Sequence, residues 1–298
     1  MTDLGFDYDK LSPIIKLALV EDIGTGDVTS DAVATPAMTA SMNFVARQVA
    51  VVAGLPLLPL LFQEISRSVS CRLLAADGDL IQPGQILAVI SGPAQALLTG
   101  ERLALNFVQR LSGIATLTHT FVEAVADSQA KIFDTRKTTP GLRLLEKYAV
   151  RVGGGSNHRM GLYDQVLIKD NHLKCLAKRS DLDSLAALVA RLRQHLPEML
   201  IEVEVENFDQ LDQAVAAGVD VVLLDNMSPR QLTQAVVRAR SRSNPPLLEC
   251  SGGVSLENVA ELAATGVDRI SIGRLTHSAP AVDIAADFVD INESQETS

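Results

Sequence analysis

Short apolar runs alternate with helical segments through the second half of this 298-residue chain. The runs lie between residues 131 and 273 and read KIFDT, QVLIK, LIEVEVE, DVVLLD, PLLECS and DRISIG. Segments with helical spacing separate the later runs, at residues 182–195, 208–217, 229–241 and 255–265. Apolar strands that alternate with helices are typical of a parallel sheet covered by helices. We therefore predict an α/β domain in this part of the chain.

An open doubly wound sheet and an α/β barrel both fit such an alternation over four units. Six or more strand–helix units follow one another in this part of the chain. The glycine motif GxGxxG, which is typical of a doubly wound nucleotide-binding sheet, does not follow the first strand. Both observations favour a compact barrel. The functional groups of such barrels lie at the carboxyl ends of the strands. Four runs close on a polar residue or a glycine at regular spacing: Glu204, Asp225, Ser251 and Gly273.

The first part of the chain, to about residue 97, has an α+β pattern. The segments suited to helices or strands are residues 10–21, 40–52, 69–75, 85–91 and 98–126. Gly113 lies inside the last of these helices and suggests a close contact there. Residues 278–291 also have helical spacing. The run DGDLIQPGQILAVISG resembles lipoyl-type folds, but residues 72–100 contain no lysine, which argues against a carrier protein.

The composition is that of an ordinary globular protein, with 47% hydrophobic and 21% charged residues. Three widely spaced cysteines indicate a reducing compartment and no disulfide framework. The first residues lack the basic and apolar segments of a signal peptide. The longest apolar run, residues 49–62, is shorter than the roughly 20 residues of a membrane helix. We therefore expect a cytoplasmic protein that does not enter a membrane.

Residues 134–172 are rich in basic side chains, although the chain has a formal net charge of -10. These side chains are Arg136, Lys137, Arg143, Lys147, Arg151, His158, Arg159, Lys169 and His172. A nucleic-acid partner would need a broad basic face, which one short segment does not provide. A compact cationic group instead favours a pocket for a small polyanionic substrate, whose charge offsets the repulsion among the cations.

Acids and a glycine loop occupy the other strand ends. Side chains alternate along a strand, so Glu202, Glu204 and Glu206 share one face. The SGG at residues 251–253 precedes a predicted helix, where backbone N–H groups can bind phosphate. Each signal alone also fits a solvated face or a turn. Their common position favours transfer of a phosphorylated, Mg²⁺-bound sugar to an anionic acceptor.

Eight motifs, in order from about residue 14 to 290, resemble quinolinate phosphoribosyltransferases, which are also called carboxylating nicotinate-nucleotide pyrophosphorylases. They are EDIGTGDVTS (21–30), ERLALNFVQRLSGIAT (101–116), DTRKTTPGLR (134–143), KYAVRVGGGSNHRMGLYDQVLIKDNH (147–172), EVEVEN (202–207), LLDNMSP (223–229), SGGVSLENV (251–259) and IGRLTHS (272–278). The chain departs from the family at Cys250 and Arg274, where small residues are usual.

The resemblance implies that quinolinate and phosphoribosyl pyrophosphate (PRPP) give nicotinate mononucleotide, pyrophosphate and CO₂, a Mg²⁺-dependent step of NAD biosynthesis. The family fold implies an N-terminal α/β sandwich domain over residues 1–112 and a TIM-like, seven-stranded open α/β barrel over residues 113–275. A C-terminal helix, residues 276–298, is expected to pack back on the first domain. A homodimer or higher homo-oligomer is also implied.

The motifs assign roles to individual residues. The carboxylates of quinolinate are expected to meet four cations: Arg136, His158, Arg159 and Lys169. Arg102 of the partner subunit would reach the same acceptor. Substrate is also expected at Thr135, and PRPP at Lys137. Ribose hydroxyls and Mg²⁺ are assigned to Glu204 and Asp225, which form the catalytic group together with Lys137 and Lys169. The 5′-phosphate is assigned to Ser251, Gly252, Gly253, Gly273 and His277.

Two other enzyme types fit part of this pattern. A Schiff-base aldolase on a similar barrel would use Lys169 as its nucleophile. A relative attached to molybdate-uptake systems shares a TRKTTPG-type motif and transfers phosphoribosyl to a different acceptor. The complete block NHRMGLYDQVLIKDNH favours quinolinate as the acceptor.

Overall fold

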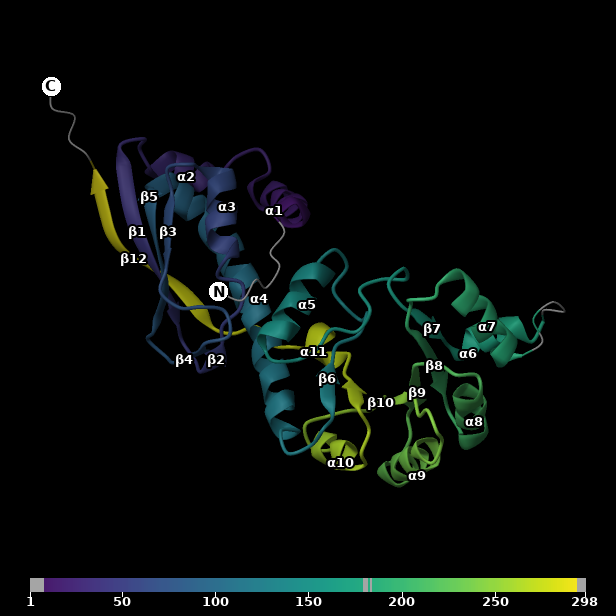
Figure 1. The fold of residues 1–298 in the computed structure, drawn as a ribbon. Helices are drawn as coiled ribbons and strands as arrows, with labels where there is room; N and C mark the ends of the chain where they lie inside the picture. Colours follow the sequence, from purple (N-terminus) through teal and green to yellow (C-terminus); the bar gives the residue numbers. More distant parts are fainter. Residues whose placement is uncertain (1–7, 179–181, 183, 294–298) are drawn as a thin grey trace. The chain divides into compact units, whose positions relative to one another are not determined.

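The computed structural model describes residues 8–178, 182 and 184–293 (Figure 1). Internal contacts divide the chain into two compact units. Unit one comprises Met1–Leu117, Thr139–Gly153 and Ser278–Ser298, and unit two comprises Thr118–Thr138 and Gly154–His277. Each unit thus combines stretches that are separate in the sequence. The predicted division into the continuous ranges 1–112 and 113–275 stays a prediction.

Unit one contains an antiparallel sheet with the strand order β12-β1-β5-β3. Its strands are β1 (Met38–Ala46), β3 (Ser70–Leu73), β5 (Ile86–Pro93) and β12 (Ile284–Glu293), and β2 (Ala50–Val51) pairs separately with β4 (Leu80–Ile81). The helices are α1 (Tyr8–Ile23), α2 (Val28–Val33), α3 (Leu57–Ile65), the first part of α4 (Ala94–Ala124) and α5 (Arg143–Val152). Met42, Phe44 and Phe62 are fully buried in the core between sheet and helices. The α+β pattern predicted for the first part of the chain is confirmed.

The C-terminal segment forms a strand, so the helix predicted over residues 276–298 was wrong. β12 pairs antiparallel with β1, and Arg47 reaches Asp287 across this pair at 2.7 Å. The spacing of the apolar residues in this segment fits the helical period as well as the strand period. The open edge of β1 offers backbone hydrogen-bond partners, and this pairing favours the strand. The short helix α11 (Arg274–His277) overlaps only the start of the predicted range. Residues 294–298 lie outside the described part of the chain.

Unit two is built on a parallel sheet with the order β6-β11-β10-β9-β8-β7, which confirms the predicted α/β architecture. Its strands are β6 (Lys131–Phe133), β7 (Val166–Ile168), β8 (Ile201–Val205), β9 (Val221–Asp225), β10 (Leu247–Ser251) and β11 (Arg269–Ser271). The helices between them are α6 (Asp170–Leu176), α7 (Leu185–His195), α8 (Phe208–Ala216), α9 (Pro229–Arg240) and α10 (Val259–Ala264). In Figure 1, α8 and α9 lie side by side.

The sheet of unit two has six strands among the described residues, one fewer than the seven predicted. A single parallel bridge joins Phe133 to Ser156 beside β6, where a seventh strand would pair. Three glycines, at residues 153–155, precede this bridge. Glycine weakens strands because it loses much backbone entropy and has no side chain to pack, so the pairing stops at one residue.

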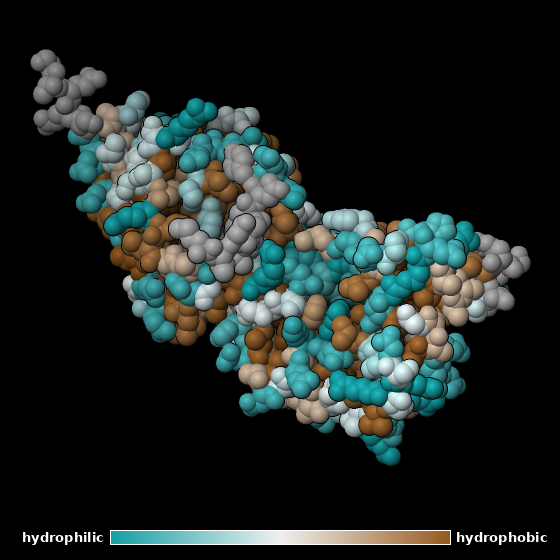
Figure 2. All heavy atoms as spheres, in the orientation of Figure 1, coloured by the Kyte–Doolittle hydropathy of each residue, from teal (hydrophilic) through white to brown (hydrophobic). Residues whose placement is uncertain are grey.

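No described helix combines the length and the apolar character that crossing a membrane requires. On the face drawn in Figure 2, hydrophilic and hydrophobic side chains are interspersed.

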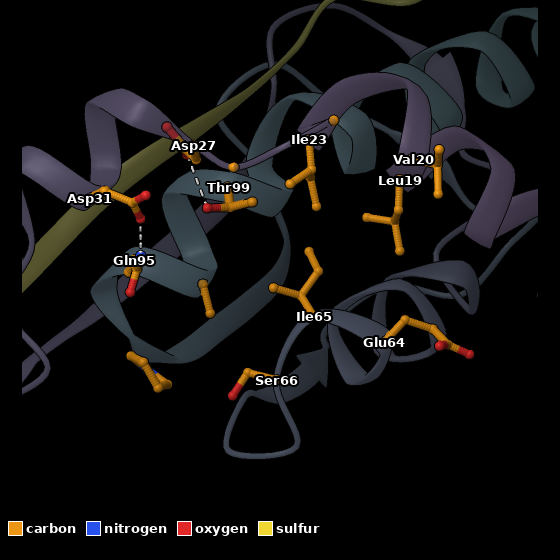
Figure 3. A pocket seen from close by; sticks show the side chains of 14 residues that line it. Leu19, Val20, Ile23, Asp27, Asp31, Glu64, Ile65, Ser66, Gln95 and Thr99 are labelled. Atoms are coloured by element: carbon orange, nitrogen blue, oxygen red, sulfur yellow. Dashed lines mark hydrogen bonds between the residues drawn. The ribbon is translucent and has the colours of Figure 1, made fainter.

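The EDIGTGDVTS motif ties helices of unit one together. Asp27 caps α2 by accepting a hydrogen bond from the Ser30 backbone N–H, and it also accepts one from Thr99 of α4 at 3.0 Å. Asp31 accepts a hydrogen bond from Gln95 of the same helix. Both pairs are visible in Figure 3, where they line a cavity of about 580 Å³. The two aspartates therefore already have structural partners.

Gly113 is a point of close approach in unit one, as the sequence suggested, although its neighbour is a loop. A Cβ atom at this position would lie 1.9 Å from the carbonyl oxygen of Pro280. The Arg110 side chain donates to the carbonyl of Ala279 at 2.8 Å, which holds the same loop against α4. Only glycine fits between this helix and the segment that leads into β12.

We predict that Gly113→Ala destabilises the protein by about 1–3 kcal/mol, the usual cost of overpacking. Alanine has a helix propensity about 1 kcal/mol more favourable than that of glycine. Any net decrease in the free energy of unfolding therefore reports the clash with Pro280. Urea unfolding measures it. Glu123→Ala, on an exposed position of α4, serves as the control and should change stability by less than about 0.5 kcal/mol. A Gly113→Ala variant as stable as the control would contradict the prediction.

Candidate active site

A cavity of about 670 Å³ opens at the carboxyl ends of the strands of unit two. Because all these strands run parallel, the residues that follow them meet at one edge of the sheet. The lining residues are Thr135, Arg136, Lys137, His158, Arg159, Leu167, Lys169, Glu204, Leu223, Asp225, Asn226, Glu249, Ser251, Gly252, Gly253 and Ser271. Most of the residues that the sequence singled out are thereby brought together.

The segment after β6 supplies the first cations. Thr135, Arg136 and Lys137 follow the strand, and the Lys137 backbone N–H donates to the Thr135 hydroxyl at 3.0 Å. Asp134, which is fully buried, accepts hydrogen bonds from the Asn157 side chain at 2.6 Å and the His158 backbone at 2.8 Å. This aspartate thereby joins two loops that carry the cavity's cations. Asp134 belongs to the DTRK motif, but the sequence analysis assigned it no role.

Arg159 is a cation held close to other cations. Its side chain is 9% exposed and donates to the Gln165 carbonyl at 3.3 Å. Burial, followed by the like charge of Arg136, lowers the pKa of Arg159, while the carboxylate of Glu202 opposes that shift. The free cavity therefore concentrates positive charge at an energetic cost that an anionic ligand would offset.

Lys169 and Glu204 form an ion pair across the cavity. Lys169 follows β7 and precedes α6, and its side chain is 44% exposed, whereas Glu204 on β8 is 14% exposed. On the next strand, Asp225 accepts a hydrogen bond from the Asn226 amide at 2.8 Å. Glu204 and Asp225 thus present carboxylates from neighbouring strands. Carboxylates are ligands that Mg²⁺ favours, so this donor set fits the ion.

A second acidic group lies deeper in unit two. Among the described residues, one group of three has its ligand atoms within 4.8 Å of one another: His158, Glu202 and Glu249. The Arg269 guanidinium lies 4.0 Å from Glu249 and stacks over the Phe133 ring at 4.9 Å. This arginine already supplies positive charge at the acids. We therefore interpret the group as a charge network and not as a metal centre.

Burial and the neighbouring charge of Glu202 raise the pKa of Glu249 to about 7. The neutral carboxyl form of Glu249 is thereby favoured over a wider pH range than for an exposed glutamate.

The SGG loop depends on glycine for its shape. Gly252 and Gly253 have φ values of 93° and 63°, a region that favours glycine. A Cβ at Gly252 would lie 2.1 Å from the side-chain oxygen of Asn226. α10 begins only at Val259, so the backbone N–H groups that this loop offers at the cavity belong to the loop itself and not to a helix end.

Gly273 and His277 do not appear in the cavity lining but adjoin it through Lys137. A Cβ at Gly273 would lie 2.9 Å from Lys137 Cδ and 3.3 Å from His277 Nε2. The Thr276 hydroxyl donates to the Lys137 carbonyl at 2.7 Å. The start of α11 therefore packs against the lysine assigned to PRPP.

Four basic residues of the sequence analysis belong to unit one. They are Arg102 on α4 and Arg143, Lys147 and Arg151 on α5. Arg102 has a 64% exposed side chain, 4.0 Å from its neighbour Glu101. Lys147, in contrast, is fully buried.

Sequence reasoning missed several residues of the site. Glu249 was detectable, because a lone glutamate in the apolar run PLLECS is costly to bury without a purpose. No sequence pattern marked Asn226. Its left-handed backbone, with a φ of 54°, becomes visible only in the turn that follows β9. Gln165 and Arg269 become neighbours of the buried acids only through the pairing of the strands.

Models of protein families match nearly the whole chain. Residues 27–112 match the N-terminal domain of quinolinate phosphoribosyl transferase, and residues 114–287 match its C-terminal domain. A probable nicotinate-nucleotide pyrophosphorylase (carboxylating) of Bacillus subtilis is 43% identical over 290 residues, covering 96% of either chain. The carboxylating nicotinate-nucleotide pyrophosphorylase of Mycobacterium leprae is 44% identical over 285 residues, covering 95% of this chain and 98% of the relative.

Solved structures agree with this relationship. The nicotinate-nucleotide pyrophosphorylase from Francisella tularensis aligns with a TM-score of 0.87 at 34% identity, covering 95% of this chain and 97% of the other. The enzyme of that name from Ehrlichia chaffeensis aligns with a TM-score of 0.86 at 39% identity, covering 93% and 98%. The sandwich-plus-barrel fold class expected from the sequence is thereby confirmed. The chain belongs to the quinolinate phosphoribosyltransferase family.

Proposed function

We propose that this protein transfers the phosphoribosyl group of PRPP to quinolinate, with loss of CO₂, and so makes nicotinate mononucleotide for NAD biosynthesis. One observation carries the proposal beyond family membership. A single cavity combines buried and half-buried cations, two carboxylates from adjacent strands and a glycine loop suited to phosphate. These three groups match the dicarboxylate, the metal-bound pyrophosphate and the 5′-phosphate of the two substrates.

The cations form the acceptor half of the proposed site. Arg136, His158, Arg159 and Lys169 all line the cavity. Charge-assisted hydrogen bonds contribute about 1.5–3 kcal/mol each, so a second carboxylate on the acceptor is worth at least one order of magnitude in affinity. This favours quinolinate over nicotinate, which has one carboxylate. Quinolinate would also relieve the repulsion between Arg136 and Arg159.

The donor half combines Lys137, which follows β6, with groups at the ends of the later strands. Lys137 would bind the pyrophosphate, while Glu204 and Asp225 would bind ribose hydroxyls and hold Mg²⁺. The ion, when bound, would supply positive charge to the leaving pyrophosphate. The 5′-phosphate would rest on backbone N–H groups of Ser251, Gly252 and Gly253, with Gly273 and His277 nearby. Thr135, which follows the same strand as Lys137, would contact substrate between the two halves.

In the proposed reaction, the protein would contribute mainly alignment of the reacting atoms and electrostatic stabilisation, and less proton transfer. The pyridine nitrogen of quinolinate attacks C1 of the ribose as the C1–O bond to pyrophosphate breaks. That nitrogen carries no proton, so this step needs no general base. Lys137 and Lys169 would stabilise the charge that develops on the leaving group and the acceptor. The positively charged ring nitrogen of the resulting intermediate then stabilises the carbanion that remains at C2 when the C2 carboxylate departs as CO₂, and a proton from water completes the nicotinate ring at C2.

The proposed assembly is a homodimer in which Arg102 of the partner subunit completes the acceptor site. The support is the family motif ERLALN together with the exposure of this side chain.

The aldolase alternative is less consistent with the site. A Schiff-base nucleophile needs an amine that can attack a carbonyl, whereas the Lys169 amine is engaged in an ion pair with Glu204. The second alternative, a different phosphoribosyl acceptor, is distinguished by assay.

The decisive assay supplies quinolinate, PRPP and Mg²⁺ and follows quinolinate absorbance and pyrophosphate release. We expect turnover with quinolinate and at least tenfold lower kcat/KM with nicotinate, because the cations match two carboxylates. A preference for nicotinate, or no turnover with either acid, would refute the proposed function.

We predict that Arg159→Ala raises the KM for quinolinate and lowers kcat/KM by at least tenfold, which corresponds to about 1.4 kcal/mol. The reason is the loss of a cation that is held inside the cavity. Steady-state kinetics measure both parameters. Arg242→Ala, a change of an exposed arginine outside the cavity, is the control and should keep wild-type kinetics. Equal kinetics for the two variants would remove Arg159 from the site.

Gly252→Ala should raise the KM for PRPP by about tenfold or more and leave the KM for quinolinate nearly unchanged. A methyl group at this position meets Asn226 and reshapes the loop that would hold the 5′-phosphate. Gly218→Ala is a matched control, since Gly218 has a φ of 73° and open space around it. It shares the backbone strain without touching the cavity. A parallel rise of both KM values in Gly252→Ala would argue against a phosphate-specific role.

A further inference from the structure

The mechanism above gives no role to two of the acids in unit two. Glu202 of β8 and Glu249 of β10 are both fully buried. Within the described part of the chain, Glu202 Oε1 has no hydrogen-bond partner. Burying a carboxylate costs several kcal/mol unless its charge is used or balanced. A pair of such groups at a substrate cavity, one in its lining and one behind it, therefore calls for an explanation.

Both acids face the same imidazole edge. His158 Nε2 lies 3.0 Å from Glu202 Oε2 and 3.5 Å from Glu249 Oε1. On the other edge, His158 Nδ1 accepts a hydrogen bond from the Arg159 backbone N–H at 2.7 Å. A ring nitrogen that accepts carries no proton, so the proton of the neutral ring sits on Nε2, toward the acids. The Arg159 N–H and the two carboxylates thus favour the same tautomer, and together they hold one ring orientation.

Glu202 also connects to Arg159 by a second route. The Gln165 side-chain amide donates to Glu202 Oε2 at 2.6 Å. The backbone carbonyl of Gln165 accepts from the Arg159 guanidinium at 3.3 Å. One carboxylate oxygen therefore holds both His158 and, through Gln165, Arg159. These are two of the groups assigned to the acceptor.

We propose that Glu202, assisted by Glu249, is a positioning residue that holds His158 and Gln165 in place, so that the loop they belong to presents Arg159 to a dicarboxylate acceptor. The inference rests on the proposed function in its choice of acceptor. Glu202 itself does not line the cavity, so it acts through the cations above it. Its charge also offsets the repulsion between Arg136 and Arg159 in the empty site.

Kinetics of Glu202→Gln test the proposal, because the substitution keeps the shape and removes the charge. We expect the KM for quinolinate to rise at least tenfold and the KM for PRPP to stay within twofold. A double-mutant cycle with His158→Ala should show coupling, so that Glu202→Gln costs far less once the imidazole is absent. Additive effects, or equal changes in both KM values, would overturn the proposal.

The tautomer of His158 gives a readout that does not depend on activity. In ¹⁵N-labelled protein, ring-nitrogen shifts distinguish the two neutral tautomers, and His158→Ala identifies the signal among the five histidines. We expect wild-type His158 to show the form protonated at Nε2, and Glu202→Gln to shift the Nε2 signal, because the charged partner of this nitrogen is lost. An unchanged spectrum in the variant would contradict the positioning role.

Two further variants keep the test decisive. Glu206→Gln, an exposed glutamate just beyond the end of β8, is the matched control and should behave as wild type. If Glu202→Gln fails to fold, Gln165→Met takes its place, because it keeps the length of the side chain and removes the amide that donates to Glu202 Oε2. It should raise the KM for quinolinate at least threefold, and an unchanged KM would count against the proposal.

Failure of this inference and failure of the proposed function have different signatures. A wild-type enzyme that does not use quinolinate refutes the function, whatever the spectra show. A wild-type enzyme that uses quinolinate, together with a Glu202→Gln variant of unchanged KM and unchanged His158 Nε2 signal, refutes only the positioning role.

Discussion

The in-register parallel pairing of β8, β9 and β10 is the constraint on which the proposed site depends. Glu204 pairs with Leu223, and Asp225 pairs with Ser251, so the carboxylates and the glycine loop reach the same edge. Because strand side chains alternate, a slip of one residue would turn Glu204 away from the cavity. The apolar outer faces of these strands, buried under the helices, hold this register.

Charge balance is the second requirement. Arg136 and Arg159 lie close enough for each to affect the other, and burial strengthens their repulsion. Glu202 offsets part of this charge, and the Arg269 guanidinium lies 4.0 Å from the neighbouring Glu249. An incoming dicarboxylate would add negative charge beside Arg136 and Arg159, which lie close to each other.

Much of this arrangement was visible in the sequence. The alternation of strands and helices predicted the parallel domain, and the residues that close each run predicted most of the cavity lining. The motifs predicted the family, because long ordered blocks such as NHRMGLYDQVLIKDNH carry both the loop and its cations. Residues 278–291 were misassigned because their apolar spacing fits a helix as well as a strand, and the free edge of β1 made the choice.

The sequence by itself determined the fold class, the strand-end positions of Lys169, Glu204 and Asp225, and membership of the family. These properties follow from local periodicity and from contiguous motifs. Only the tertiary structure decided that Glu202 and Glu249 share one imidazole. The two acids lie on strands separated by β9 and by more than forty residues of chain, so no local pattern links them. Their contact exists because the parallel sheet brings the side chains of β8 and β10 together at the His158 imidazole.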